Sequence, residues 1–155
     1  MAGRIQEELK QTRPIGSLEE EAYLNLQRTS NALSQGIAEL LRSQDLTPAQ
    51  YNVLRILRGA GEGGLNASDI GGRMISRDPD ITRLVDRLEK RGLVDRWRCS
   101  EDRRVVWTRL SQAGRALIEP LDAPLDAVHR RLLSHMPPER LRTLIELLEE
   151  ARDGA

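Results

Sequence analysis

The chain has 155 residues, a length typical of one domain or of a small domain with a helical extension. With 39% apolar and 31% charged residues it can bury a core, and it contains no apolar run long enough to span a membrane. The charged N-terminus lacks the apolar segment of a secretory signal, and the single cysteine excludes an intramolecular disulfide. We therefore expect a cytoplasmic protein with a reduced thiol.

The charge of the chain is balanced overall but unevenly distributed. Its 24 basic and 24 acidic side chains cancel. Residues 71–115, however, hold 12 Lys and Arg against 7 Asp and Glu, which leaves a net charge of +5 there and −5 in the remainder. A basic module within an acidic frame is typical of a protein that binds nucleic acid with one face.

Capping motifs mark the first predicted helices. Ser17 and Glu20 form a capping box. The serine side chain accepts a hydrogen bond from a backbone N–H of the helix, and the glutamate side chain accepts one from the backbone N–H of the serine. A long stretch of apolar residues at helical spacing follows. Thr47-Pro48 supplies an N-cap and a first-turn proline for a second helix, whose end we expect at Gly59.

A short helix, a turn and another helix are predicted next. Asn66 is the expected N-cap of the short helix at 67–74. We expect the following helix to span 79–91, with Asp78 as N-cap and Pro79 in the first turn, and to end before Gly92. The apolar stripe of that helix consists of Ile81, Leu84, Val85 and Leu88.

The hydrophobic period then changes from that of a helix to that of a strand. Two runs at 93–99 and 105–110 predict a β-hairpin with an arginine-bearing tip. Ser111 caps a further long helix, which Pro120 and Pro124 should kink because each removes a backbone donor. A last helix begins at residues 137–138.

Several motifs in this order point to one known family. They are LTPAQYNVLRIL (46–57), ITRLVDRLEKRGLV (81–94), the wing residues Asp102-Arg103-Arg104, and LSQAG (110–114). Over about residues 46–118 the chain therefore resembles the MarR family of bacterial transcriptional regulators. The resemblance implies a mainly α fold with a small β-hairpin wing: a winged helix-turn-helix DNA-binding domain at 46–111, and a helical dimerisation arm formed by residues 1–45 and 112–155.

We expect double-stranded DNA to be one partner, because a major groove about 12 Å wide admits one α-helix. The predicted helix at 79–91 keeps its apolar stripe for the core and turns arginines outward. A single module reads few bases, so we also expect a homodimer whose two modules bind a pseudo-palindrome. The residues assigned to DNA contact are Ser68, Arg77, Asp80, Thr82, Arg83, Arg87, Arg103 and Arg104.

Some of these residues have a second interpretation. Asp80 fits either support of the helix start or acceptance of a hydrogen bond from a cytosine amino group. Arg87 fits a DNA contact or a solvated face on which Asp86 pairs with Lys90. The wing arginines fit insertion into a minor groove, with Asp102 orienting its neighbour, or two exposed turn side chains.

The resemblance also implies a switch, in which a repressor is released by a small aromatic or anionic effector bound between arm and DNA-binding domain. Tyr51 and Arg55 on the second predicted helix could line such a pocket. In the alternative interpretation, Tyr51 lies at the edge of the core and Arg55 lies on the surface. Cys99 offers a redox alternative, because Arg98 and the wing arginines lie near it in sequence and would lower its pKa; otherwise it is an incidental cysteine.

Other functional classes lack support in the sequence. We find no paired-carboxylate or nucleophile–histidine motif, so we expect neither an enzyme nor a bound cofactor. The two histidines, His129 and His135, have no helical spacing that would hold a metal ion. A winged-helix module for protein–protein contact is the remaining alternative, because a fold does not dictate its partner.

Overall fold

The computed structural model describes residues 3–77 and 80–155, which form two compact units, Met1–Glu119 and Pro120–Ala155. Each unit is considered by itself. Within the described residues the chain is mostly helical, with a two-stranded antiparallel hairpin, so the predicted fold class is confirmed. No helix in that part of the chain combines the length and apolarity needed to cross a membrane.

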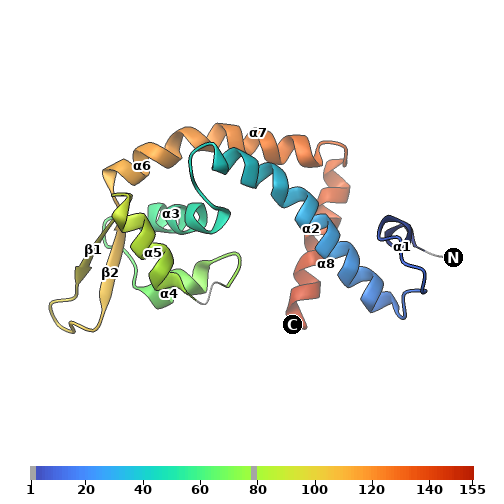
Figure 1. Cartoon of the computed structure of the whole chain (residues 1–155), viewed down its shortest axis with the longest axis horizontal. Helices are drawn as coiled ribbons and strands as arrows, with labels where there is room; N and C mark the ends of the chain where they lie inside the picture. Colours follow the sequence, from blue (N-terminus) through green and yellow to red (C-terminus); the bar gives the residue numbers. More distant parts are fainter. Residues whose placement is uncertain (1–2, 78–79) are drawn as a thin grey trace. The chain divides into compact units, whose positions relative to one another are not determined.

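The helices and strands follow the predicted order (Figure 1). The first unit contains α1 (Arg4–Glu8), α2 (Leu18–Arg42), α3 (Pro48–Ala60), α4 (Ala67–Arg73), α5 (Ile81–Lys90), β1 (Val94–Arg98), β2 (Val106–Leu110) and α6 (Gln112–Ile118). A single 3-10 turn, Glu119–Leu121, leads to α7 (Asp122–Leu133) and α8 (Pro138–Asp153) in the second unit. The interruption at Pro120 is as predicted, whereas α1 was not.

The predicted N-caps account for four of the eight α-helix starts among the described residues. The side chains of Ser17, Thr47, Asn66 and Ser111 each accept a hydrogen bond from the backbone N–H three residues on. The capping box at Ser17 is only half as expected, because the Glu20 carboxylate accepts from the N–H of Gly16 at 2.8 Å rather than from Ser17. A complete capping box instead joins Thr47 and Gln50.

Two predicted helix ends were wrong. α3 continues past Gly59 to Ala60, and its C-cap is Gly61, whose φ of +74° lies in the left-handed region that favours glycine. α5 starts at Ile81 rather than at residue 79, because Asp80 is the residue that caps it. The cap predicted at Asp78 and the proline at 79 lie outside the described residues. Gly92, with a φ of +71°, ends α5 as expected.

The core of the first unit is built from the end of α2, the apolar faces of α3 to α6 and the inner face of the hairpin. Its buried side chains include Leu41, Leu46, Val53, Leu54, Leu57, Leu65, Ile70, Val85, Leu88, Val94, Leu110 and Ile118. Leu65 adds a short third strand segment, because its backbone exchanges two 2.8 Å hydrogen bonds with Thr108 of β2. The hairpin is therefore fixed along one edge to the chain that precedes α4.

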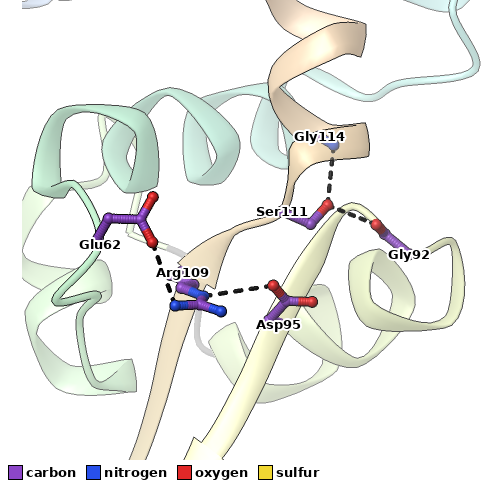
Figure 2. A network of polar contacts seen from close by, with 6 residues as sticks. All are labelled: Glu62, Gly92, Asp95, Arg109, Ser111 and Gly114. Atoms are coloured by element: carbon purple, nitrogen blue, oxygen red, sulfur yellow. Dashed lines mark hydrogen bonds and ion pairs between the residues drawn. The ribbon is translucent and has the colours of Figure 1, made fainter.

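The junction between the hairpin and α6 depends on one hydroxyl. Ser111 donates to the carbonyl of Gly92 at 2.6 Å and accepts from the N–H of Gly114 at 3.0 Å (Figure 2). The absence of a side chain at Gly114 lets α6 approach the backbone carbonyl of Leu93. These contacts hold the end of α5, the end of β2 and the start of α6 together.

An arginine of β1 fixes α5 to the hairpin. The guanidinium of Arg96 lies 2.6 Å from a carboxylate oxygen of Asp86 and 2.8 Å from one of Glu89, both on α5. The alternative in which Asp86 pairs with Lys90 is not observed, because the Asp86 carboxylate pairs with Arg96 of β1 instead. The hydrogen bond from Arg96 holds the pKa of Glu89 below its ordinary value.

This ion pair predicts an acid-sensitive contact. Because the pKa of Glu89 is lower in the folded chain than in the unfolded one, its contribution is present above about pH 4.3 and is lost as the pH falls through the folded pKa. Arg96→Met should lower the free energy of unfolding at pH 7 by about 1 kcal/mol or less, since the partners are partly exposed. The difference from the wild type should shrink toward pH 3.5, measured by denaturant unfolding at one protein concentration.

Arg98→Met is the matched control, because Arg98 lies on the same strand but donates to the backbone carbonyl of Arg103 instead of to a carboxylate. Its effect should not vary with pH in this range. An Arg96→Met deficit that stays constant down to acid pH would contradict the account.

Candidate nucleic-acid interface

α5 presents a polar face to solvent and an apolar face to the core. Val85 and Leu88 are buried, whereas Thr82, Arg83 and Arg87 are exposed. This separation follows from the helical spacing of the apolar residues, which leaves the side chains between them on the outer face. In helix-turn-helix proteins the corresponding helix enters the major groove with its N-terminal residues directed at base edges. Thr82 and Arg83 occupy that end of α5.

Asp80 serves the helix at the same end. Its Oδ1 accepts a hydrogen bond from the backbone N–H of Arg83 at 3.0 Å, which makes it the N-cap of α5. Of its two predicted roles, support of the helix start is therefore observed. A carboxylate at this position interacts favourably with the positive end of the helix dipole and fixes the backbone that carries Thr82.

A hollow of about 430 Å³ brings together three predicted DNA contacts that are distant in the sequence. Ser68 borders it from the first turn of α4, Thr82 from the first turn of α5, and Arg104 from the hairpin. The lining includes the hydroxyl-bearing side chains of Ser68 and Thr82 and the cationic side chain of Arg104. The chemistry of this lining suits an oxyanion such as a backbone phosphate.

The hairpin tip holds its backbone with local hydrogen bonds and leaves its cationic groups exposed. Asp102 Oδ1 accepts from the N–H of Arg104 at 3.0 Å and lies 3.6 Å from Nε of the same arginine. The carbonyl of Arg103 accepts from the Arg98 guanidinium at 2.8 Å. Both Arg103 and Arg104 are exposed, so Asp102 sits where it can orient its neighbour, as predicted.

The base of the hairpin contains a polar network that the sequence analysis missed. The Arg109 guanidinium on β2 lies 3.5 Å from Asp95 on β1 and 3.3 Å from Glu62 in the loop before α4 (Figure 2). It also lies over the Trp97 ring, 5.4 Å from the ring centre. Asp95 and Arg109 are direct cross-strand partners, so the hairpin register would have revealed this half of the network.

A buried amide fixes the turn between α4 and α5. Asn52, on α3, accepts a hydrogen bond through Oδ1 from the N–H of Ile75 at 2.8 Å. Its Nδ2 is buried and has no hydrogen-bond partner among the described residues. Arg77 is exposed two residues after Ile75, in the turn that the amide holds. No sequence signal identified Asn52, because a polar residue on a mostly apolar helix gives no indication of a partner 23 residues away.

The residues proposed for switching have less definite surroundings. Tyr51 is half-buried and Arg55 is exposed, one turn apart on α3, and neither borders the hollow between α4, α5 and the hairpin. An effector role for this pair remains a prediction. Within residues 3–77 and 80–155 no three His, Cys, Asp or Glu side chains gather as a metal site would require.

Cys99 has a lowered pKa, but for a different reason from the one expected. Hydrogen bonds from the backbone N–H groups of Asp102 and Glu101, followed by the side chain of Trp107, stabilise the thiolate. We expected neighbouring arginines to lower this pKa, and that cause was wrong. Hydrogen-bond donors of the hairpin turn lower it instead. The cysteine itself is half-buried.

Comparisons with known proteins agree with this geometry. Residues 46–106 match the model of the MarR family. The chain is 32% identical over 118 residues, 76% of its length and 75% of the relative's, to the HTH-type transcriptional repressor MdtR of Bacillus subtilis. A crystal structure of a MarR transcription factor from Planctomyces limnophilus is 42% identical with a TM-score of 0.68, covering 86% of this chain and 96% of the other.

A second solved structure has a bound small molecule. The PcaV transcriptional regulator from Streptomyces coelicolor, in complex with its natural ligand, is 25% identical with a TM-score of 0.68 and covers 80% of this chain and 89% of the other. The level of identity to the Bacillus repressor, the extent of the match and the shared winged helix establish that the chain belongs to the MarR family of transcriptional regulators.

Proposed function

We propose that this protein is a homodimeric transcriptional repressor that binds a pseudo-palindromic operator and is released by a small-molecule effector. The observation that carries the proposal is the set of exposed side chains at the starts of α4 and α5 and at the hairpin tip, which includes Ser68, Thr82, Arg83, Arg103 and Arg104. Because the genome is the partner, this function places the protein in the cytoplasm.

Each predicted contact residue has a role that its position supports. Arg83 is assigned to a base edge or phosphate, Thr82 to a phosphate or thymine methyl group, and Arg77 in the turn to a phosphate. Ser68 and Arg104 flank the hollow between the helix starts and the hairpin, where a phosphate would fit. Arg103 and Arg104 lie at the wing tip; we assign Arg103 to the adjacent minor groove and Arg104 to a phosphate beside that groove. Arg87 lies one turn further along α5 and would contact the backbone.

The helices outside residues 46–111 supply the proposed dimer arm. α2 leaves Leu18, Tyr23 and Leu26 exposed, and no residue of α8 is buried although Ile145 and Leu147 are apolar. Apolar side chains repeated along long helices are stabilised when a second copy covers them. In a twofold dimer the two copies of α5 would meet half-sites about 10 bp apart, centre to centre.

Release by an effector follows from population shift. The PcaV relative binds a natural ligand, and the family resemblance implies an aromatic or anionic molecule. Such a ligand need only favour a spacing of the two α5 helices that mismatches the half-sites. Tyr51 and Arg55 are our candidates for contacting it, because they lie on one face of α3 and combine an aromatic ring with a cation.

The DNA assignment predicts a change in salt dependence. Arg104→Ala should reduce the slope of log affinity against log salt by about 0.9, because one phosphate contact is lost. Arg83→Glu should abolish sequence-preferring binding, since it places a carboxylate against the groove. Fluorescence anisotropy with a duplex selected from a random DNA pool, over a range of salt concentrations, measures both.

Arg140→Ala and Arg140→Glu, on exposed α8, are the matched controls and should bind like the wild type. A wild-type protein with no salt-sensitive, sequence-preferring binding would contradict the repressor and favour a protein–protein interaction module.

The dimer assignment predicts a loss of association when charge enters the apolar stripe of α2. Tyr23→Glu combined with Leu26→Glu should weaken dimerisation at least about 100-fold. Burial of each apolar side chain contributes about 1.5–3 kcal/mol to the free energy of association, and both contributions are lost in the variant. Sedimentation velocity at micromolar concentration should show a wild-type dimer and a monomeric variant. Gln35→Glu, on an exposed position of the same helix, should remain dimeric. A monomeric wild type would refute the dimer.

A further inference from the structure

The turn between α4 and α5 carries a predicted DNA contact but receives little support from its own residues. Its described part is residues 74–77, and Arg77 in that part is assigned to a phosphate. The Ile75 side chain is 80% exposed, so it adds little apolar packing. α4 has only seven residues, and two of those in its last turn are Gly71 and Gly72. Glycine leaves a helix backbone more freedom than alanine does, so α4 supports the turn weakly.

A side chain from another helix holds this turn. Asn52 lies on α3, 23 residues before Ile75, and its Oδ1 accepts a hydrogen bond from the backbone N–H of Ile75 at 2.8 Å. Asn52 is only 5% exposed, so its amide is fixed among the core residues of the first unit. The adjacent backbone hydrogen bond, from the N–H of Met74 to the carbonyl of Gly71, is longer at 3.3 Å. The amide of Asn52 therefore ties the turn to the core.

The same amide has a cost in stability. Nδ2 of Asn52 is buried and has no hydrogen-bond partner among the residues that the structure describes. A buried donor without a partner loses its hydration without compensation, and this cost is at least comparable with the net contribution of the one hydrogen bond that Oδ1 accepts. Leucine has nearly the same shape and would avoid the cost. The stability of the fold therefore does not explain an asparagine here, whereas the geometry of the turn does.

We infer that Asn52 is a positioning residue for DNA binding, although it is buried and does not itself contact a duplex. By holding the N–H of Ile75, it fixes the backbone two residues before Arg77 and so the point from which that guanidinium reaches a phosphate. An ordered turn loses less conformational entropy on binding than a mobile one. The inference rests on the proposed function, because the position of Arg77 matters only if DNA is bound.

The first measurement needs no DNA. In Asn52→Leu the N–H of Ile75 loses its acceptor, so its hydrogen exchange, followed by NMR on the full-length protein, should become about tenfold faster or more. The thermal unfolding midpoint should stay within about 4 °C of the wild type, because the lost hydrogen bond and the removed unpaired donor offset each other.

Gln50→Met is the matched control. Gln50 is also buried on α3, but its Oε1 accepts from the backbone N–H of Thr47 at 3.0 Å rather than from the turn. This variant also removes an amide that accepts from a backbone N–H. It should leave both the exchange of Ile75 and the binding of DNA unchanged.

The second measurement is the affinity for a duplex selected from a random DNA pool, at several salt concentrations. Asn52→Leu should weaken binding about tenfold and reduce the slope of log affinity against log salt by about 0.9, because the phosphate contact of Arg77 is lost although no charge is removed. A merely structural loss of folded protein would lower the apparent affinity equally at all salt concentrations and leave this slope unchanged.

Double variants test whether Asn52 acts through Arg77. The combination of Asn52→Leu with Arg77→Ala should bind no more weakly than Arg77→Ala alone, since both changes remove the same contact. Combined with Arg104→Ala, a separate contact on the hairpin, the effect of Asn52→Leu should add.

The opposite results would overturn the inference. A wild-type salt slope in Asn52→Leu, or an effect that adds fully to that of Arg77→Ala, would show that the amide does not position this contact. A midpoint lowered by more than about 4 °C in Asn52→Leu and also in a second variant, Asn52→Met, would assign the amide to the stability of the whole fold. A wild type that does not bind the duplex would overturn the proposed function as well, whereas a failure of the inference alone leaves wild-type binding intact.

Discussion

The attachment of α5 to the hairpin is the constraint on which the remainder of the first unit depends. One face of the helix is buried through Val85 and Leu88, and Arg96 of β1 holds two carboxylates of the same helix from the side. Ser111 then joins the end of α5 to the start of α6. A helix fixed on two sides in this way keeps a third side open, and that side carries Thr82 and Arg83. Specific DNA contact requires such rigidity, because a misplaced side chain loses its partner atom.

The arrangement of acidic and basic groups explains how a chain with no net charge can hold a nucleic-acid interface. Several arginines of the basic segment are neutralised by neighbouring carboxylates: Arg96 by Asp86 and Glu89, and Arg109 by Asp95 and Glu62. These pairs stabilise the hairpin and its contact with α5. The exposed arginines of α5 and the wing tip are the ones that we propose for DNA contact. A total charge cannot reveal this division, because it counts structural and functional arginines alike.

Local signals made much of the fold predictable from the sequence. The caps at Thr47, Asn66 and Ser111, the break at Pro120 and the change of period at the hairpin all act over a few residues, so they can be read without knowing the fold. The partners of Asp86 and Asn52 could not be predicted, because they depend on which elements meet. The start of α5 was misplaced because three successive residues of the sequence, Asp78, Pro79 and Asp80, all favour a helix start, and Asp80 is the N-cap of the helix. The exposed positions of Arg83 and Arg104 followed from periodicity, whereas the hollow that joins Ser68, Thr82 and Arg104 needed the tertiary structure.

We propose that the starts of α4 and α5 and the hairpin tip together form the surface that binds DNA. Hydrogen–deuterium exchange of the full-length protein, with and without a selected operator duplex, tests it most directly. We predict that the duplex slows amide exchange in residues 67–69, 80–84 and 102–105 and leaves residues 42–47 unchanged. Protection confined to 42–47 or to α8, with none at the start of α5 or the hairpin tip, would contradict it.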